Sequence, residues 1–576
     1  MDQIAKGASP DRASFLDLFT PKLVTTLRER QGIVGLKADA LAGLTVAIVA
    51  LPLSMAIAIA SGVGPERGLY TAIVGGALVS ALGGSRFQIG GPAGAFIILV
   101  AATVQRQGVD GLILATFLSG LFLLAMGFLR IGTYIKFIPF PVTVGFTAGI
   151  AVIIFLSQLR DLLGLTLSGG GGSEGLAARL SVLAKGLPTA DPLTALLAFG
   201  TIGLILLLRR IAPGWPGMLI AVAFGGLLAW GFTLPVETIG TRFGEIPAGL
   251  PAPRLPDLSM ARILSILPDA GAFALLGAIE SLLSAVVADG MSGRRHRSNC
   301  ELVGQGVANM GSALFGGICV TGTIARTATN VRAGAWSPLA GMFHSLFLLI
   351  FLVVAAPLAA FIPLACLAGV LALVAWNMVE RHAIAILLRT SRGDALVLSA
   401  TFFLTLFRDL TEGILAGFLL GTLLFVHRMS RSIEVSAHQP FVAEDQADGL
   451  PTDREAYEGG AADPSVVVYR ITGALFFGAA ANVGAILDRI SDRRQAFVLD
   501  FTAVPFLDST GANAIEGAAR KAERQGVRLY ISGTSPEIRA ALAAHGVTLP
   551  LAHVTDTVEE ALDHIGRNRE QVLARG

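Results

Sequence analysis

Two stretches of the sequence decide the fold: residues 90–98 read GGPAGAFII, and residues 316–326 read GGICVTGTIAR. Each is a run of small residues that interrupts apolar sequence of membrane-spanning length, and each leads into a segment with helical character. Backbone that leaves the helical conformation inside a bilayer is tolerated only where protein or a water-filled cavity covers it. We therefore predict that both stretches are interior breaks from which half-helices start.

The composition indicates a membrane protein with a polar C-terminal domain. Of the 576 residues, 53% are hydrophobic and 15% are charged, whereas about a quarter of the residues in an average soluble protein are charged. A net charge of +2 is too small to favour nucleic acid as a partner. From about residue 430 onward acidic and basic residues intersperse as in a soluble domain, so we expect two domains.

Segments poor in charged residues, several of them short or interrupted by Gly and Pro, recur in two groups of seven and are interpreted as membrane spans. The first group covers 38–61, 68–83, 92–105, 110–129, 138–159, 192–208 and 215–235, and the second covers 268–288, 300–316, 323–333, 335–356, 361–379, 394–407 and 411–427. Asp39 begins the first group and Asp269 the second, while Pro92 and Gly322 mark the breaks, and both pairs are 230 positions apart (269 − 39 and 322 − 92). An odd number of spans per half turns the second copy over, which predicts an all-α polytopic domain of about 14 spans, a 7+7 inverted repeat.

The expected order of regions follows from these segments. We expect a cytoplasmic N-terminal segment (1–37) without a cleavable signal sequence, a transmembrane domain (38–430), a linker (431–464) and a cytoplasmic soluble domain (465–570). In the soluble domain, predicted strands at 466–471, 496–501 and 528–532 alternate with predicted helices at 479–490 and 509–525, which indicates a small α/β domain. The residues 168–175 form a glycine-rich connector on the outside.

The short loops predict a multi-pass inner-membrane protein with both termini in the cytoplasm. In this orientation the basic clusters fall on the inside, as the positive-inside rule requires. The clusters consist of Arg130, Lys136, Arg209, Arg210, Arg294, Arg295, Arg297, Arg381, Arg389 and Arg392.

The first break supplies backbone groups. Pro92 suits the first position of a helix, and Gly91 and Gly94 let a ligand approach the backbone closely. The amides of Gly94, Ala95 and Phe96 would be unpaired donors at a helix N-terminus, which carries about half a positive charge. An anion suits such a position. Close packing between helices is the alternative explanation of the glycines.

The second break repeats this design and adds a charge. Thr321, Gly322 and Thr323 precede a helical segment, and Arg326 follows one turn later. Inserting an arginine near the centre of a membrane helix costs about 2.5 to 3.5 kcal/mol, so a function is the first hypothesis. A snorkelling or salt-bridged arginine is the alternative. We predict that the two breaks form two halves of one anion site.

Glu280 lies in the middle of the eighth segment, far from either end. It could carry a proton, bind Na⁺, or offset Arg326 in a structural pair. Ser284, one turn later on the same helix face, could share a cation with it. We find no metal-ligand spacing, no cofactor motif and no catalytic constellation. The sequence contains no GK dipeptide, which excludes a P-loop.

Four stretches resemble the sulfate permease (SulP) family of secondary anion transporters. They are DALAGLTVAIVALPLSMAIAIASG (39–62), GGPAGAF (90–96), GAIESLLSAVVAD (277–289) and TGTIARTATNVRAG (321–334). The tail resembles the STAS domain of that family, and a regulatory phosphoserine of STAS relatives corresponds to Ser509. The resemblance implies a homodimer with a moving core (spans one to four and eight to eleven) and a gate (spans five to seven and twelve to fourteen).

The resemblance also implies where the anion lies and leaves its identity open. It places the anion between the N-termini of spans three and ten, at Gly91–Phe96 and Thr321–Arg326, and a coupling or charge-compensating residue at Glu280. Leu53 and Ser54 follow the proline of span one, where many sulfate-transporting relatives have Gln, and this lining is closer to bicarbonate-type members. Those members tend to lack an arginine at the position of Arg326. Sulfate, bicarbonate and a C4-dicarboxylate remain candidates.

We therefore expect a secondary active transporter of small anions, not an enzyme, that runs as a symporter with H⁺ or Na⁺ by an elevator or rocking movement. A passive anion channel on the same fold is one alternative. A regulatory interaction platform, in which the STAS domain binds a cytoplasmic regulator, is another. A nucleobase transporter is disfavoured because Arg326 between two helix N-termini suits an anion better than a neutral base.

Overall fold

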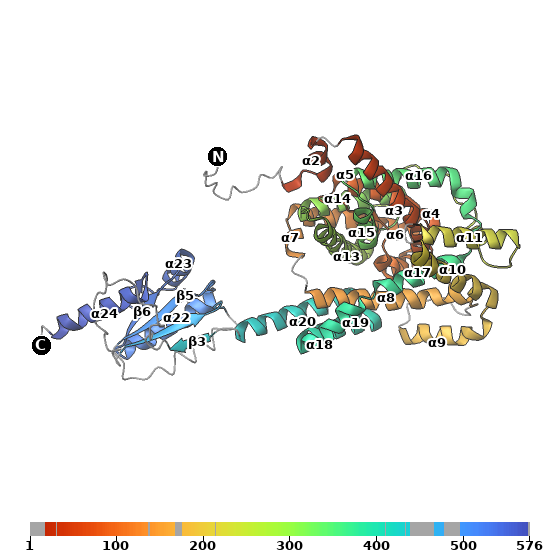
Figure 1. The fold of residues 1–576 in the computed structure, drawn as a ribbon. Helices are drawn as coiled ribbons and strands as arrows, with labels where there is room; N and C mark the ends of the chain where they lie inside the picture. Colours follow the sequence, from red (N-terminus) through yellow and green to blue (C-terminus); the bar gives the residue numbers. More distant parts are fainter. Residues whose placement is uncertain are drawn as a thin grey trace. The chain divides into compact units, whose positions relative to one another are not determined.

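The computed structural model describes residues 18–29, 32–135, 139–166, 176–212, 215–408, 410–431, 434–437, 466–476 and 496–573. The chain divides into two compact units, Met1–Leu419 and Leu420–Gly576. In the described residues, the first unit is helical apart from one pair of very short strands, and the second is built on a five-stranded sheet (Figure 1).

Each predicted segment of the first half lies on a helix. The segments predicted at 92–105 and 110–129 are joined in one helix, which is interrupted at Gly108, where φ is 70°. The helices are α3 (Ile33–Ala60), α4 (Pro65–Tyr70) continuing through η1 (Thr71–Gly75) into α5 (Gly76–Leu82), α6 (Ile97–Phe128), α8 (Phe140–Leu163), α10 (Pro192–Ile211) and α11 (Gly217–Gly231).

The seven predicted segments of the second half also coincide with helices. They are α13 (Met260–Ser292), α14 (Ser298–Leu314), α15 (Ile324–Arg332), α16 (Leu339–Ala359), α17 (Leu364–Met378), α19 (Arg392–Phe407) and α20 (Leu410–Arg431). Within the described residues, eight helices of the chain are long and apolar enough to cross a membrane. The count of about fourteen spans therefore stays a prediction.

Several helices were not predicted, because they are short or polar. The hydrophilic stretch after residue 236 contains a short helix and also the first turns of α13, which begins at Met260 instead of near residue 268. The unpredicted helices are α2 (Lys22–Arg28), α7 (Gly132–Ile135), α9 (Leu176–Gly186), α12 (Ile239–Phe243) and α18 (Arg381–Thr390). The predicted connector at 168–175 and the predicted helix at 479–490 lie outside the described residues.

The two breaks meet inside the first unit. β1 (Gly90–Gly91) pairs with β2 (Thr321–Gly322) as antiparallel strands, with Gly90 opposite Gly322 and Gly91 opposite Thr321. Asn309 of α14 holds the segment before β2, because its side chain accepts a hydrogen bond from the Val320 amide at 2.9 Å and donates one to the Val320 carbonyl at 2.8 Å. The crossing point is thereby fixed by the strand pairing and by hydrogen bonds from the Asn309 side chain to the backbone.

Small residues let the helices around this crossing pack closely. A Cβ atom at Gly120 of α6 would lie 2.6 Å from the Gly306 carbonyl oxygen of α14, and one at Gly306 would lie 2.7 Å from the Gly120 carbonyl oxygen. The two backbones are therefore in contact, as in other membrane helix pairs with small residues at the interface.

The second unit is the predicted α/β domain. β4 (Val466–Thr472), β5 (Ala496–Ala503), β6 (Arg528–Ser532) and β7 (His553–Thr555) are parallel, and β3 (Glu434–Ala437) adds to β4 as an antiparallel edge. The helices are α22 (Ser509–Arg524), α23 (Pro536–Ala544) and α24 (Val558–Leu573). Asp508 caps α22 by accepting a hydrogen bond from the Gly511 amide at 2.8 Å. Ser509, the next residue, is exposed.

Candidate functional site

Both half-helices begin at the strand pair. η2 (Gly94–Phe96) follows β1 and continues into α6, while α15 follows β2. The residues just before them, Ala93 and Thr323, are extended and make no side-chain capping bond. The positive ends of two helices are therefore directed at the crossing point, which favours negative charge there.

The start of the first half-helix differs from the prediction in two details. Helical structure begins at Gly94, so Pro92 precedes the helix instead of opening it. The Phe96 amide donates a hydrogen bond to the Ala93 carbonyl at 3.1 Å and is not a free donor. The reason is that a tight 3₁₀ turn satisfies one of the amides that an α-helical start would leave unpaired.

Arg326 lies at the crossing with only 2% of its surface exposed. Its Nη2 donates hydrogen bonds to Ser54 Oγ at 3.1 Å and to the Pro92 carbonyl at 3.2 Å. Its Nε and Nη1 have no hydrogen-bond partner, and no carboxylate of the described residues lies within 4.0 Å of the guanidinium. A salt-bridged Arg326 is therefore not observed, and two charged donors remain free.

Two predicted residues of the first half, Gly91 and Ser54, lie beside this guanidinium. A Cβ atom at Gly91 would overlap Nη1 of Arg326, so any side chain there would displace the guanidinium from its observed position. Ser54 is the hydrogen-bond acceptor from α3, and Leu53 beside it is buried. A Cβ atom at Gly94 would lie 3.4 Å from Ile154 Cδ1 of α8 and 3.7 Å from Met378 Sδ of α17.

The aromatic ring of Phe96 and the small side chain of Ala95 are both buried. The ring packs edge-on against Phe273 of α13, with ring centroids 6.0 Å apart. This contact joins the start of the first half-helix to a helix of the second half. Ala95 and Phe96 therefore contribute packing at this position.

The threonines of the second break hold the crossing together. Thr321 Oγ1 and Ser281 Oγ of α13 are hydrogen-bonded at 2.8 Å, and the Gly322 amide donates to Ser281 Oγ at 3.2 Å. Thr323 donates from its amide to the Ile89 carbonyl at 3.1 Å. These groups bind protein atoms, whereas Nε and Nη1 of Arg326 have no hydrogen-bond partner among the described residues.

Glu280 and Ser284 lie on α13 beside the second break. Ser284 Oγ donates a hydrogen bond to Thr327 Oγ1 of α15 at 3.0 Å, which leaves its oxygen able to accept or to bind a cation. Glu280 is buried. Within the described residues its carboxylate forms neither a hydrogen bond nor an ion pair, so the alternative of a structural pair between Glu280 and Arg326 is not seen.

Three buried polar residues near the breaks were not predicted. Ser281 holds β2, as described above, and its one sequence signal is that it follows Glu280. The amide of Gln88 packs against Gly322, and neither of its polar atoms has a hydrogen-bond partner. His344 of α16 is completely buried, and both of its ring nitrogens lack a partner too. Polar uncharged residues are common in membrane helices, so the sequence alone did not distinguish these three.

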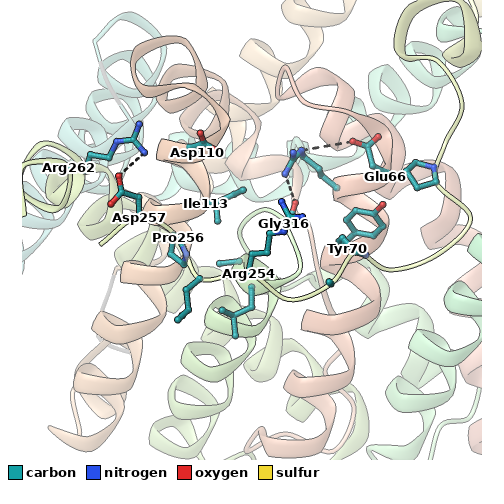
Figure 2. Close-up of a pocket in the computed structure, with 16 residues that line it drawn as sticks. Glu66, Tyr70, Asp110, Ile113, Arg254, Pro256, Asp257, Arg262 and Gly316 are labelled. Carbon is teal, nitrogen blue, oxygen red and sulfur yellow. Dashed lines mark hydrogen bonds and ion pairs between the residues drawn. The ribbon is translucent and has the colours of Figure 1, made fainter. Parts of the chain in front are cut away.

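A pocket of about 620 Å³ lies elsewhere in the first unit (Figure 2). It is lined by the start of α4, the start of α13 and the loop before it, and not by the predicted anion residues. Arg67 donates a hydrogen bond to the Gly316 carbonyl at 2.7 Å and lies 4.0 Å from Glu66 (Figure 2). This contact ties α4 to the first residue of the second break.

Residues 36–401 match the model of the sulfate permease family, and residues 461–561 match that of the STAS domain. The chain belongs to the sulfate permease family. The predicted family and the predicted C-terminal STAS domain are thereby confirmed.

Relatives of this sulfate permease family member are transporters. A putative sulfate transporter (YvdB) of Bacillus subtilis is 39% identical over 515 residues, which cover 88% of this chain and 93% of the relative. The bicarbonate transporter BicA of Picosynechococcus is 31% identical over 524 residues, 88% of this chain and 90% of the relative.

The fold also matches a solved structure. The murine anion transporter Slc26a9 in its inward-facing state superimposes with a TM-score of 0.82, covering 97% of this chain and 96% of that chain at 18% identity. The predicted fold class, a mostly helical membrane domain followed by an α/β STAS domain, is therefore confirmed.

Proposed function

We propose that this sulfate permease family member is a secondary active transporter that moves a small anion across the inner membrane. Relatives of 39% and 31% identity carry the names of sulfate and bicarbonate transporters, which supports these two anions, and a C4-dicarboxylate is the third candidate. We further propose a homodimer with both termini in the cytoplasm, in keeping with the arginines on the predicted inner loops.

One observation carries the proposal: Arg326 is buried at the crossing of the half-helices with two free donors, and no described residue supplies an acidic partner. A buried charge without compensation is strongly unfavourable. An oxyanion would accept hydrogen bonds from Nε and Nη1, and guanidinium binds such groups with two parallel bonds. The N-termini of η2 and α15 would add their dipoles on the same side.

The neighbours of the site support alternating access. Gly94 faces α8 and α17, which hold the fifth and twelfth predicted spans and therefore belong to the predicted gate. The rest of the site comes from α3, α13 and α15, which belong to the predicted core. An anion at Arg326 would thus lie at the boundary between core and gate, where sliding of one against the other exposes it to each side in turn.

Glu280 and Ser284 are proposed as the coupling site for H⁺ or Na⁺. Both lie on α13, which is hydrogen-bonded to the second break through Ser281 and to α15 through Ser284. A cation beside the Glu280 carboxylate would therefore act on the same backbone that presents Arg326. Carboxylate and hydroxyl oxygens suit a hard cation.

The experiment is competitive uptake into vesicles that contain the purified full chain. Labelled sulfate, bicarbonate and fumarate are offered in turn under an imposed pH gradient or an imposed Na⁺ gradient. Accumulation above equilibrium that follows one gradient identifies the anion and the coupling ion. Anion current without accumulation under either gradient would replace the proposal by a passive channel.

Glu280→Gln should abolish accumulation driven by the cation gradient and leave downhill anion flux measurable. The substitution keeps the size of the side chain but removes the charge that a proton or Na⁺ would bind. Glu412→Gln on α20, an exposed carboxylate, is the matched control. If the Glu280 variant still accumulates anion to the wild-type level, the coupling assignment is wrong.

The proposed domain limits are a linker at 431–464 and a STAS domain at 465–570. The proposed role of the STAS domain is to regulate transport. Ser509 is exposed at the first position of α22. A phosphate there would meet a helix N-terminus, which favours negative charge. We therefore propose Ser509 as a regulatory phosphorylation site, through which a cytoplasmic regulator acts on the transporter.

A further inference from the structure

We propose that the end of α13 at the predicted cytoplasmic face binds the phosphate headgroup of an anionic membrane lipid. The site is a pocket of about 440 Å³, lined by Val286, Asp289, Gly293, Arg294, Arg295 and His296. Its lining residue nearest to Glu280 in the sequence is Val286, six positions later on α13, and the pocket shares no residue with the proposed anion site.

The turn that ends α13 builds this pocket. Gly293 adopts the left-handed conformation with φ at 69°, and its amide donates to the Asp289 carbonyl at 2.8 Å. This Gly-terminated end folds the chain back against the last turn of the helix. Arg294 and Arg295 are thereby placed beside Val286 and Asp289.

The carboxylate that lines the pocket, Asp289, already has hydrogen-bond partners within the protein. Asp289 Oδ2 accepts a hydrogen bond from the His296 amide at 3.0 Å and lies 2.6 Å from His296 Nδ1. The other ring nitrogen of His296 lies 3.0 Å from Ser298 Oγ, so the ring is fixed on both sides. Arg294 and Arg295 are exposed and form no ion pair within the described residues, which leaves two guanidinium groups free to bind an anion.

The surroundings of the pocket are positively charged. Lys22 of α2 is half-buried, and burial, followed by the charges of Arg297 and Arg86, lowers its pKa. Arg297 also holds the N-terminal segment here, because its Nη1 donates to the Thr20 carbonyl at 2.6 Å. Burial is the larger cause of the lowered pKa of Lys22; the smaller contributions of Arg297 and Arg86 reflect positive charge near Lys22, which Asp289 and Glu29 oppose.

The position of the pocket favours a lipid phosphate over a free one. α13 is a membrane-length helix, and the pocket lies at its end. Val286 and Met291 are 46% and 39% exposed there, so apolar surface for acyl chains adjoins the two free arginines. Basic groups at the cytoplasmic end of a membrane helix attract anionic lipid headgroups.

The test measures lipid binding to the purified full chain by native mass spectrometry, with phosphatidylglycerol, phosphatidylcholine and inorganic phosphate as separate probes. The variant is Arg294→Gln/Arg295→Gln. The matched control is Arg209→Gln/Arg210→Gln, an exposed arginine pair at the end of α10 on the same predicted face. Arg294→Lys/Arg295→Lys keeps the charge.

We expect phosphatidylglycerol to bind in preference to phosphatidylcholine. Loss of both arginines should weaken this binding on the order of tenfold or more, while the control pair and the lysine variant bind nearly as the wild type does. Equal weakening by the control pair would overturn the site. Inorganic phosphate binding as tightly as phosphatidylglycerol would overturn the assignment to a lipid.

Discussion

Gly91 and Arg326 show how a single missing side chain shapes the proposed site. Gly91 lies opposite Thr321 in the strand pair, and a methyl group at position 91 would occupy the space of Arg326 Nη1. The sequence suggested that this glycine lets a ligand approach the backbone, whereas in the structure it makes room for the guanidinium of the other half. The residue that carries the charge and the residue that makes room for it come from different repeats.

Gly91→Ala should lower the initial uptake rate about tenfold to a hundredfold, mainly through a higher KM. The reason is that a shift of about 1 Å in a positioned group has effects of this size. Gly200→Ala on α10 is the control, because a Cβ atom there meets open space. An unchanged KM for Gly91→Ala would show that the guanidinium does not need its observed position.

The sequence predicted the charged residues of the site better than their partners. Arg326 and Glu280 stood out because ionisable residues are rare inside membrane segments. That Ser54 accepts a hydrogen bond from Arg326, and that Ser281 binds the second break, follows from helix packing that no local pattern encodes. For the same reason the sequence leaves a pair between Glu280 and Arg326 open. In the structure the two side chains form no ion pair with each other.

At the level of elements, one aspartate near the start of each predicted repeat forms hydrogen bonds with residues of the other repeat. Asp39 begins the first predicted span and accepts hydrogen bonds from the amides of Trp336 and Ser337, beyond the end of α15. Asp269 begins the eighth and accepts one from Thr103 Oγ1 at 3.0 Å, near the end of the first half-helix, and also pairs with Arg106. Each half-helix is thus held at its far end by the other repeat.

The same offset relates these contacts, since 39 and 269 differ by 230, as do 106 and 336. The offset was read from the sequence as a mark of duplicated halves. The crossed contacts agree with that interpretation, because positions related by the offset meet in both halves, through the Trp336 amide in one case and the Arg106 side chain in the other. The sequence did not show that the contacts are exchanged between halves.

Asp39→Asn should destabilise the protein more than Asp269→Asn does. Asp39 is fully buried and also accepts from Ser337 Oγ at 2.5 Å, so we expect a loss on the order of 2–4 kcal/mol. Arg106 is 55% exposed, which limits the loss at Asp269 to about 1 kcal/mol. Thermal unfolding of both variants measures the difference, with the exposed Asp257→Asn as the control. Equal shifts in Tm would contradict this ranking.

The whole molecule consists of two units with separate cores. The core around Ala47, Phe96 and Leu348 belongs to the membrane unit, and the core around Phe497, Leu499 and Ile531 belongs to the STAS unit. The change in composition near residue 430 predicts a membrane domain and a soluble domain, and the two compact units divide inside α20, between Leu419 and Leu420. The short helices between spans were missed, because a few polar turns carry no periodic signal that differs from a loop.

A chain that ends at residue 431 should fold and bind the anion with an affinity within about twofold of the full chain. The physical reason is that the STAS core shares no residue with the core that surrounds Arg326. Gel filtration and equilibrium binding test this. A changed transport rate with unchanged anion affinity would mean that the STAS domain regulates transport. Loss of anion binding would contradict the proposal that the membrane unit alone forms the anion site.

The most direct test of the account compares Arg326→Ala with Arg332→Ala, an exposed arginine at the other end of α15. Both variants remove one positive charge from the same helix, and both are measured for equilibrium anion binding and for uptake in vesicles. We predict that Arg326→Ala abolishes binding and uptake while the protein stays folded, and that Arg332→Ala retains both. Wild-type binding and uptake in Arg326→Ala would contradict the account.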